Sequence, residues 1–439
     1  MKMTGRIGFI SLGCAKNLVN SEQMMYRLSE AGYDVSGETE NVDAVIVNTC
    51  GFIESAQSEA IDVILSLAEA KAAGSISKII VMGCLAQRFQ EEIIKELPEV
   101  DAVCGVGEYE NIVAIVKRTL SGETVLDFGD INKPEEECGR VLTTSPLWEY
   151  VKIAEGCDNR CAYCVIPDLR GRYRSRKIED IVAECQSLAD GGVRELIIIA
   201  QDITRYGKEL YGKRMLAELL RKICKIDGVM WIRLHYLYPD DIDDELIDVI
   251  ASEEKILKYL DIPIQHINDS ILKTMCRRGT GDEIRELFKK LRERIPGLVL
   301  RTSLIAGLPG EGEAEFEELC EYLREAKIER AGVFPFSPED GTKAAKMEHP
   351  DSDTAQRRAE LIMELQNDIM EEYNASRIGN VYTVLVEDFD GTYYSGRSYA
   401  ESPDIDGKVY FTSDELVTAD FAEVKITEII DGEPYGVCV

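Results

Sequence analysis

The chain contains 439 residues, more than one ordinary hydrophobic core organises, and this length fits two or three domains. Its net charge of −31 argues against a protein that binds nucleic acid mainly through phosphates, and favours either a basic partner or simple solubility. No signal peptide and no stretch of about 18 apolar residues is evident, so no membrane helix is expected. Thirteen cysteines in so long a chain indicate a reducing cytoplasm, where clustered cysteines more often bind metal or react than cross-link.

Residues 1–130 alternate short apolar runs with stretches of helical spacing. Strands are expected at 6–12, 43–49, 78–82 and 101–104, and helices at 21–31, 54–73, 89–97 and 110–120. This alternation predicts an α/β domain of the doubly wound kind, with a parallel sheet covered by helices on both faces.

Three cysteines follow the first three predicted strands. Cys14, Cys50 and Cys84 each stand next to a glycine in a strand-to-helix turn. Because sites form at the carboxyl edge of an open parallel sheet, these thiols can converge on a metal although they are far apart in sequence. The alternative is three buried cysteines acting as small apolar residues. Cys104, at the end of the possible fourth strand, is a rival ligand.

Residues 131–143 are predicted to form an acidic linker, and residues 144–375 repeat a strand–helix unit. Six strands are expected, at 150–153, 195–200, 231–235, 259–264, 299–305 and 332–336, with helices between them. Six such units predict a partial (βα)6 barrel, in which chemistry takes place at the carboxyl ends of the strands. We expect polar residues there, each of which is also consistent with an ordinary loop position: Glu195, Gln201, Asp202, His235, Gln265, His266 and 301–303.

A second group of cysteines follows the first barrel strand. Cys157, Cys161 and Cys164 are spaced C-x3-C-x2-C, so one loop can present three thiolates to a soft metal centre. A 4Fe–4S cluster normally takes four thiolates, and three leave one iron open, as in a catalytic site. Zinc and chance free cysteines are the alternatives, but no fourth Cys or His follows at zinc-finger spacing.

Residues 376–439 are predicted to form a small all-β barrel. Short β-rich runs at 381–387, 393–398, 408–411 and 422–429 replace the helices. This segment contains four basic residues and thirteen acidic ones. A barrel that binds single-stranded RNA needs a positive groove, so the charge fits a basic protein better than RNA.

The loop of Cys157, Cys161 and Cys164, with Tyr163 before the last cysteine, resembles the radical S-adenosylmethionine (SAM) signature. Residues 166–176, with alternating arginines, resemble the methylthiotransferase branch of that family. The resemblance implies that the open iron binds SAM and that an electron from the cluster cleaves SAM to a 5′-deoxyadenosyl radical. It also implies SAM contacts from the barrel rim, with Tyr163, Glu195, Gln201 and Arg301 as candidates.

The two ends of the chain resemble the same family. S-L-G-C-A-K-N-L-V-N-S-E (11–22), N-T-C-G-F-I (48–53) and M-G-C-L-A-Q-R (82–88) resemble its amino-terminal motifs. In the family, the cysteines of these motifs hold an auxiliary 4Fe–4S cluster, which here implies Cys14, Cys50 and Cys84. G-N-V-Y-T-V-L-V-E (379–387) resembles the TRAM domain that closes these enzymes.

Within the family, the chain resembles the RimO type, which modifies an aspartate of the twelfth small-subunit ribosomal protein. The motif at 11–22, P-I-Q-H-I-N at 263–268 and the acidic TRAM domain favour this type over the tRNA-modifying MiaB type. A third hypothesis is an iron–sulfur redox or scaffold protein without SAM chemistry. Opposite charge would steer a basic substrate to the enzyme, and direct nucleic-acid binding is not expected.

The resemblance implies two 4Fe–4S clusters and SAM as both radical source and methyl donor, with an electron donor as a further partner. The β-carbon of aspartate carries no acidic hydrogen, so no protein base is assigned, and His235 and His266 are treated as structural or substrate-facing. Sulfur must reach the substrate carbon, so both cysteine groups are expected to face one cavity between the first two domains.

Overall fold

The amino-terminal unit of the computed structural model, which describes residues 5–439, is built on a parallel sheet with the strand order β2-β1-β3-β4-β5-β6. Its strands are β1 (Arg6–Ser11), β2 (Asp34–Ser36), β3 (Val42–Thr49), β4 (Ile76–Gly83), β5 (Ala102–Cys104) and β6 (Val125–Asp127). Its helices are α1 (Ala15–Glu30), α2 (Glu54–Ala72), α3 (Cys84–Phe89), α4 (Glu91–Glu96) and α5 (Ile112–Leu120), with a 3-10 turn at Val106–Asn111. The first four residues of the predicted domain 1–130 lie outside the described residues.

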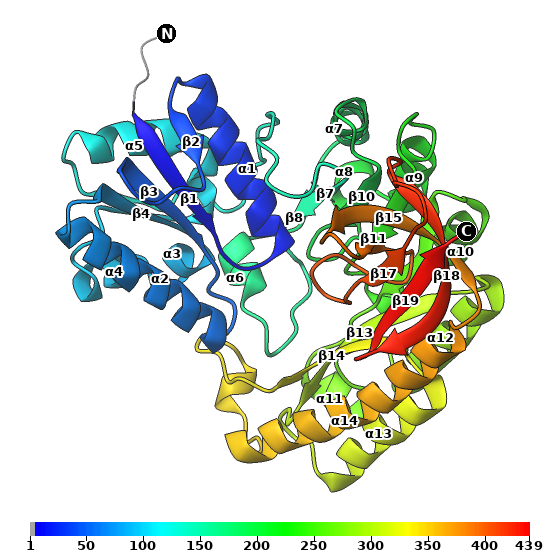
Figure 1. Cartoon of the computed structure of the whole chain (residues 1–439). Coiled ribbons are helices and arrows are strands. Elements are labelled where there is room, and N and C mark those ends of the chain that lie inside the picture. Colours follow the sequence, from blue (N-terminus) through cyan, green and yellow to red (C-terminus); the bar gives the residue numbers. More distant parts are fainter. Residues whose placement is uncertain (1–4) are drawn as a thin grey trace.

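Separate hydrophobic cores lie on the two faces of this sheet. Side chains of α1 and α5 pack with one set of strand residues, and those of α2, α3 and α4 pack with the alternate set. Helices therefore cover both faces, as Figure 1 shows, and the predicted doubly wound arrangement is confirmed.

Three details of this unit differ from the sequence prediction. Helix α1 begins at Ala15 rather than at residue 21, because buried polar residues such as Asn17 and Asn20 hide the helical pattern of its first turns. The helix expected at 89–97 is two short helices, α3 and α4, separated at Gln90, whose φ is +47°. The edge strands β2 and β6 are only three residues long each, too short to stand out in the sequence.

The central unit is a six-stranded parallel sheet with the order β14-β13-β12-β11-β10-β7. The strands are β7 (Trp148–Lys152), β10 (Glu195–Ile199), β11 (Trp231–Leu234), β12 (Ile256–Asp261), β13 (Val299–Ala306) and β14 (Arg330–Pro335). The helices are α6 (Ile166–Arg170), α7 (Ile178–Asp190), α8 (Lys208–Tyr211), α9 (Leu216–Ile223), α10 (Asp244–Ser252), α11 (Asp269–Thr274), α12 (Gly281–Arg294), α13 (Glu313–Ala326) and α14 (Ser352–Ser376). Six parallel strands, joined through helices, confirm the partial barrel.

Short elements complete this unit. The antiparallel pair β8 (Ala154–Glu155) and β9 (Arg174–Ser175) brackets the Cys157 loop, and 3-10 turns lie at Pro239–Asp241 and Ala344–Lys346. The loop that contains Cys157, Cys161 and Cys164 is thereby held at both ends.

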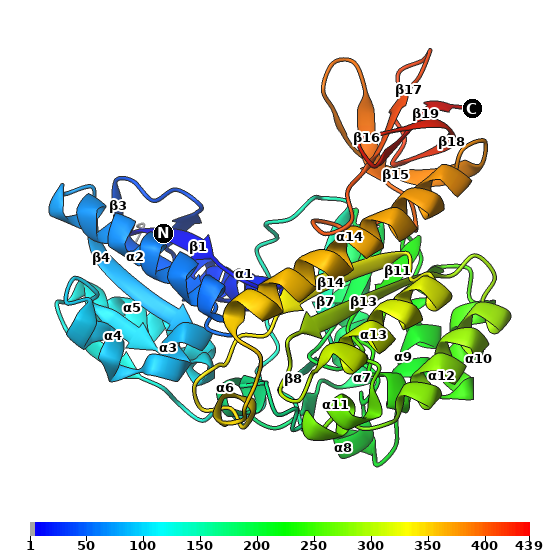
Figure 2. The same cartoon turned by 90° about the horizontal axis from the view of Figure 1, so that it is seen from below.

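The carboxy-terminal unit is a closed five-stranded barrel with the order β15-β16-β17-β19-β18. Its strands are β15 (Val381–Phe389), β16 (Tyr394–Arg397), β17 (Val409–Thr412), β18 (Phe421–Ile430) and β19 (Glu433–Cys438). Figure 2 shows helix α14 running from the central sheet to this barrel. The predicted small β-barrel is confirmed. Within residues 5–439, no helix is both long enough and apolar enough to cross a membrane.

One loop of the small barrel, residues 398–406, is inserted against the inner strands of the central unit. The Arg233 guanidinium donates to the Ser398 and Tyr399 carbonyls, and the Tyr259 hydroxyl donates to the Asp406 carboxylate. The hydroxyl of Ser402 lies 2.9 Å from His235 Nε2. The last domain is therefore anchored inside the partial barrel rather than tethered loosely to it.

Candidate metal centres

Three parallel strands bring the amino-terminal cysteines together. Cys14 follows β1 and caps α1, Cys50 follows β3, and Cys84 is the first residue of α3 after β4. A Cβ placed on Gly13 would lie 2.5 Å from the Cys50 Cβ, and one on Gly51 would lie 3.0 Å from the carbonyl carbon of Cys84. Only glycine permits such close packing of the turns, which explains the glycine beside each cysteine. The predicted convergence of the three turns is confirmed.

The electrostatic surroundings of these thiols show that they lie within mutual range. Burial raises the pKa of Cys84 to about 11; the thiolates of Cys14 and Cys50 add to this rise, and the Arg170 guanidinium opposes it. Desolvation also raises the pKa of Cys14, but Lys16 and Arg170 outweigh it and leave that pKa below the usual value. Arg170 Nε donates to Cys84 Sγ at 3.2 Å, which places a cation among the thiols.

The second cysteine group lies on the loop between β8 and α6. The Cys157 amide donates to the Gly171 carbonyl at 3.1 Å, and the Ala162 amide donates to the Met275 carbonyl at 2.9 Å. Burial raises the pKa of the Cys157 thiol to about 12, with a contribution from the Cys161 thiolate. Arg277 Nη1 lies 4.0 Å from Cys161 Sγ, so this group also has a neighbouring guanidinium.

The donor sets fit clusters better than single ions. Within residues 5–439, no three His, Cys, Asp or Glu side chains are placed to share one metal ion. A 4Fe–4S cube binds each thiolate through a different iron, so its ligands need not converge on one point. Each set offers three soft thiols from converging turns or a single loop, beside a guanidinium that compensates negative charge.

The two cysteine groups lie side by side across the boundary between the first two units. Cys84 packs against Val165, which directly follows Cys164, and against Leu169 of α6. Arg170 spans the same boundary: its Nη1 lies 3.2 Å from Glu155 Oε2, and its Nη2 donates to Asn17 Oδ1. Proximity of the two groups is what the sequence-based mechanism requires.

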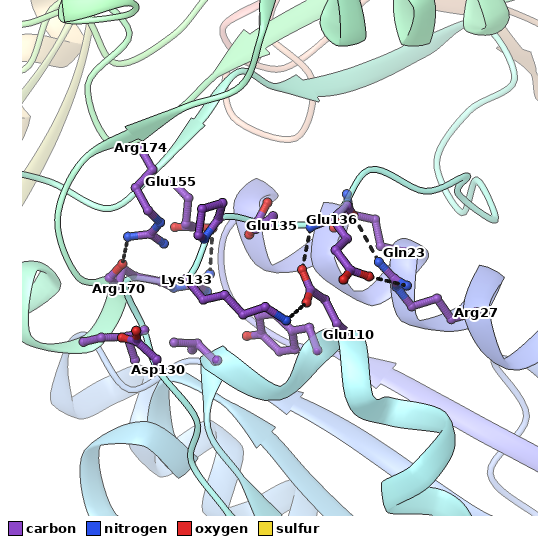
Figure 3. A pocket seen from close by; sticks show the side chains of 15 residues that line it. Gln23, Arg27, Glu110, Asp130, Lys133, Glu135, Glu136, Glu155, Arg170 and Arg174 are labelled. Atoms are coloured by element: carbon purple, nitrogen blue, oxygen red, sulfur yellow. Dashed lines mark hydrogen bonds and ion pairs between the residues drawn. The ribbon is translucent and has the colours of Figure 1, made fainter. Parts of the chain in front are cut away.

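A small polar pocket adjoins this boundary. It lies where the linker crosses the amino-terminal unit, and Figure 3 shows Glu155, Arg170 and Arg174 on one side of it and Glu110 and Lys133 on another. Ion pairs also fix the linker in place, because the buried Arg140 guanidinium binds Glu22, Glu149 and Glu184. The predicted linker is thus a fixed part of the domain boundary.

Two of the four candidate SAM contacts lie near the cysteine loop. Gln201 follows β10, its Nε2 donates to Glu155 Oε1 at 2.6 Å, and its Oε1 is buried without a partner among the described residues. An amino group bound beside the Cys157 loop would satisfy this oxygen. The Tyr163 hydroxyl accepts from Arg277 Nη1 at 3.0 Å, so the ring is fixed beside the cysteines.

The expected rim position of Glu195 is wrong, whereas Arg301 lies beside the last residue of β12, Asp261. Glu195 is the first residue of β10, at the opposite edge of the sheet, where Arg233 and Arg397 each approach its carboxylate to 2.7 Å. Arg301 is the third residue of β13, and its Nη1 lies 2.8 Å from Asp261 Oδ1. Glu195 can stand at the buried start of its strand because Arg233 and Arg397, the latter from the last domain, compensate its charge.

The remaining candidate residues are buried among groups that account for them structurally. His235 is buried with its pKa well below the usual value, because desolvation and the nearby Arg233 disfavour the charged form. His266 Nε2 lies 3.5 Å from Glu311 Oε2, and the Glu311 carboxylate accepts the Gly307 amide. Cys104 is the last residue of β5 and points into the core, and burial raises its pKa to about 12.

Sequence reasoning missed Arg170, Arg277 and Glu155. The alternating arginines of residues 166–176 were a usable signal, because a buried arginine in an acidic chain needs a specific partner. Nothing in the local sequence singles out Arg277, which reaches Cys161 from the end of α11.

Three family models match the chain in succession. They are described as uncharacterized protein family UPF0004 (residues 6–105), the radical SAM superfamily (151–323) and the TRAM domain (378–439). Among solved structures, the radical SAM methyltransferase TsrM from Kitasatospora setae matches with a TM-score of 0.55 at 15% identity, covering 76% of this chain and 77% of that one. At this identity the likeness shows the fold alone.

Curated relatives are much closer in sequence. A protein of Acetivibrio thermocellus named ribosomal protein uS12 methylthiotransferase RimO is 47% identical, covering 99% of this chain and 98% of its own. A protein of the same name from Lachnoclostridium phytofermentans is also 47% identical, over 96% and 97% of the two chains. The chain therefore belongs to the RimO family of radical SAM methylthiotransferases.

Proposed function

We propose that this protein transfers a methylthio group to the β-carbon of an aspartate in ribosomal protein uS12. The relatives that carry this activity in their names match the chain from end to end. The observation in the structure that carries the proposal is the adjacency of the two three-cysteine groups at one domain boundary, where Cys84 packs against Val165 and Leu169 and Arg170 links Cys84 to Glu155. Sulfur and substrate carbon must meet within contact distance, and this arrangement supplies both sites to one space.

We assign one cofactor to the cysteines on each side of the domain boundary. Cys157, Cys161 and Cys164 would hold one 4Fe–4S cluster, and Cys14, Cys50 and Cys84 would hold the auxiliary one. When bound, the clusters and SAM supply the radical, the sulfur and the methyl group, and the protein needs no general base for a carbon that is not acidic. With the groups bound, Arg277 and Arg170 would balance thiolate charge, Tyr163 would shield the loop, and Gln201 Oε1 could accept a hydrogen bond from the amino group of SAM.

The outer surface of the last domain supports a basic protein substrate. Arg377 and Arg397, two of its four basic residues, are buried in ion pairs with Glu401 and Glu195. The exposed carboxylates therefore remain largely uncompensated: Asp388, Asp390, Asp404, Asp414, Glu415, Glu423, Glu428 and Asp431. Such a surface attracts a basic ribosomal protein and repels the phosphates of tRNA, which disfavours the MiaB type. A ribosomal substrate supports a cytoplasmic enzyme that receives electrons from a separate donor.

Mass spectrometry tests the proposal directly. Reconstituted protein is incubated anaerobically with SAM, a reductant and either uS12 or tRNA, and both substrates are analysed for the added mass. The expected result is one methylthio group on an aspartate of uS12 and none on tRNA. A methylthio group on tRNA alone would contradict the proposal, and so would absence of 5′-deoxyadenosine, which would favour an iron–sulfur protein without SAM chemistry.

A further inference from the structure

A short segment of the central unit touches both cysteine groups. This bridging segment, residues 336–344, follows β14 and reaches the amino-terminal unit near the start of α2 (Figure 1). At one end, the Ala344 amide donates to the Ala162 carbonyl at 2.9 Å, between Cys161 and Cys164. Phe336 and Ala344 also pack against Ala162 in one apolar cluster.

In the middle of the bridging segment, the carboxylate of Glu339 faces the loops of Cys50 and Cys84. It accepts the Glu54 amide at 3.1 Å, Gln57 Nε2 at 3.1 Å and Arg88 Nη1 at 2.9 Å. Glu54 follows Cys50 by four residues, and Arg88 lies one turn after Cys84 on the same helix, α3. Glu339 is 6% exposed, so water does not screen these contacts.

The contact with Glu54 replaces a missing helix cap. Helix α2 begins after Ile53, which makes no side-chain capping bond, although the first amides of any helix need acceptors. A carboxylate from another domain satisfies one of them and is favoured by the helix dipole. Arg88 completes the junction, because it also donates to the Gly51 carbonyl at 2.9 Å and the Asp340 carbonyl at 3.0 Å.

We propose that Glu339 is a positioning residue that fixes the Cys50 and Cys84 loops at a set distance from the Cys161–Cys164 loop. The inference rests on the proposed function, since only transfer of sulfur between the two sites needs that distance. SAM cleavage uses the Cys157 loop alone and does not need it. Loss of Glu339 should therefore uncouple the two steps rather than stop both.

The test measures 5′-deoxyadenosine and methylthiolated uS12 in the same reaction, for wild type, Glu339→Gln and Glu339→Ala. A displacement of about 1 Å at a reacting centre can cost on the order of 10²-fold in rate, so we expect product per 5′-deoxyadenosine to fall up to that extent in Glu339→Ala. Glu339→Gln keeps one acceptor oxygen, so its product per 5′-deoxyadenosine should lie between the values of wild type and Glu339→Ala. Asp420→Asn is the matched control, because it breaks the Arg194–Asp420 interdomain pair, away from the cysteines.

Two further measurements separate positioning from general damage. Hydrogen exchange of the Glu54 amide should accelerate in Glu339→Ala, while the amide of Asn17, bonded to the Cys14 carbonyl, keeps its protection. Arg88→Ala combined with Glu339→Ala should cost less than the sum of the two single variants, because the two side chains share one ion pair.

The outcomes distinguish the two claims. An unchanged product ratio in Glu339→Ala, or an equal loss of both products, would overturn the positioning role. A ratio lost equally in Asp420→Asn would overturn it as well. Wild-type enzyme that releases 5′-deoxyadenosine but never modifies uS12 would instead refute the proposed substrate.

Discussion

Arg170 contacts groups from both sides of the domain boundary through one side chain. It is almost fully buried, with a thiol, a carboxylate and an amide oxygen around its guanidinium. Its pKa is well above the usual value, because Cys84 and Glu155 outweigh desolvation. A permanently charged group here balances thiolates and orients Glu155, which in turn holds Gln201.

Replacing Arg170 should therefore be costly. Arg170→Ala leaves Glu155 buried with only Lys152 as its cation, and loss of one partner of a buried pair costs about 3 to 5 kcal/mol. We expect a clearly lower unfolding temperature for the apo-protein and weaker iron incorporation. Arg172→Ala is the control, since Arg172 is exposed and pairs only with Asp158, where a surface pair contributes about 1 kcal/mol or less. Equal effects of both substitutions would contradict this role.

At the residue scale, the sequence predicts which cysteines gather but not which residues support them. The six cysteines follow from spacing and strand ends, because chain connectivity alone dictates where they gather. Arg277, Arg170 and Glu339 could not be predicted in the same way, because their roles depend on contacts between segments distant in sequence. Glu195 was misjudged for the same reason, since its partner Arg397 lies in another domain.

Among the elements, the loop of residues 398–406 joins the last domain to the partial barrel. The Glu401 carboxylate is buried, accepts the Ser398 amide and hydroxyl, and pairs with Arg377 and Arg330. Desolvation alone would raise its pKa, but the two guanidinium groups outweigh it and lower the pKa to about 2. The loop is therefore stabilised by a charge that acid removes.

This predicts a specific pH dependence. The stabilisation from ionised Glu401 is fully present above the ordinary pKa of about 4.5 and is lost as the pH falls through about 2; the difference amounts to on the order of 3 kcal/mol. The difference in unfolding midpoint between wild type and Glu401→Gln should be constant from pH 7 to pH 5 and shrink below. Both tryptophans report on this interface, because Trp148 lies under Arg397 and Trp231 packs against Phe421. A difference that grows toward acid would contradict the assignment.

The strand β10 gives a second prediction at this scale. Glu195 binds Arg233 and Arg397 with no exposed surface, so Glu195→Gln should release the last domain and change tryptophan fluorescence. The cost expected for an uncompensated buried charge is about 3 to 5 kcal/mol. SAM affinity should not change, because Glu195 lies at the amino end of β10. A selective loss of SAM binding, with fluorescence unchanged, would show that Glu195 contacts the cofactor after all.

Most helices and strands can be predicted from the sequence, because hydrophobic periodicity marks the long helices and buried strands and glycines mark where helices end. The parallel sheets and the small β-barrel were both predicted in this way. The short edge strands β2 and β6 and the break at Gln90 were not, because they are decided by pairing and packing rather than local preference.

For the whole molecule, charge distribution separates the substrates. The exposed carboxylates of the last domain should steer a basic protein, so neutralising Asp388, Asp390 and Asp431 should raise KM for uS12 with little change in kcat. The salt dependence of KM should weaken in the same variant, because fewer charges remain to be screened. Neutralising Glu91, Glu92 and Glu96 of α4 removes the same charge elsewhere and should leave KM unchanged. Equal effects of the two variants on KM would show that the net charge of the protein, and not the carboxylates of the last domain, selects the substrate.

The central claim is that two adjacent cysteine sites divide one reaction between them. The most direct test compares Cys84→Ala and Cys157→Ala with wild type, measuring 5′-deoxyadenosine and methylthiolated uS12 together. Wild type should give both products, Cys84→Ala should release 5′-deoxyadenosine without methylthiolated uS12, and Cys157→Ala should give neither. Methylthiolation by Cys84→Ala at the wild-type rate would contradict the account, because the amino-terminal cysteines would then have no part in sulfur transfer.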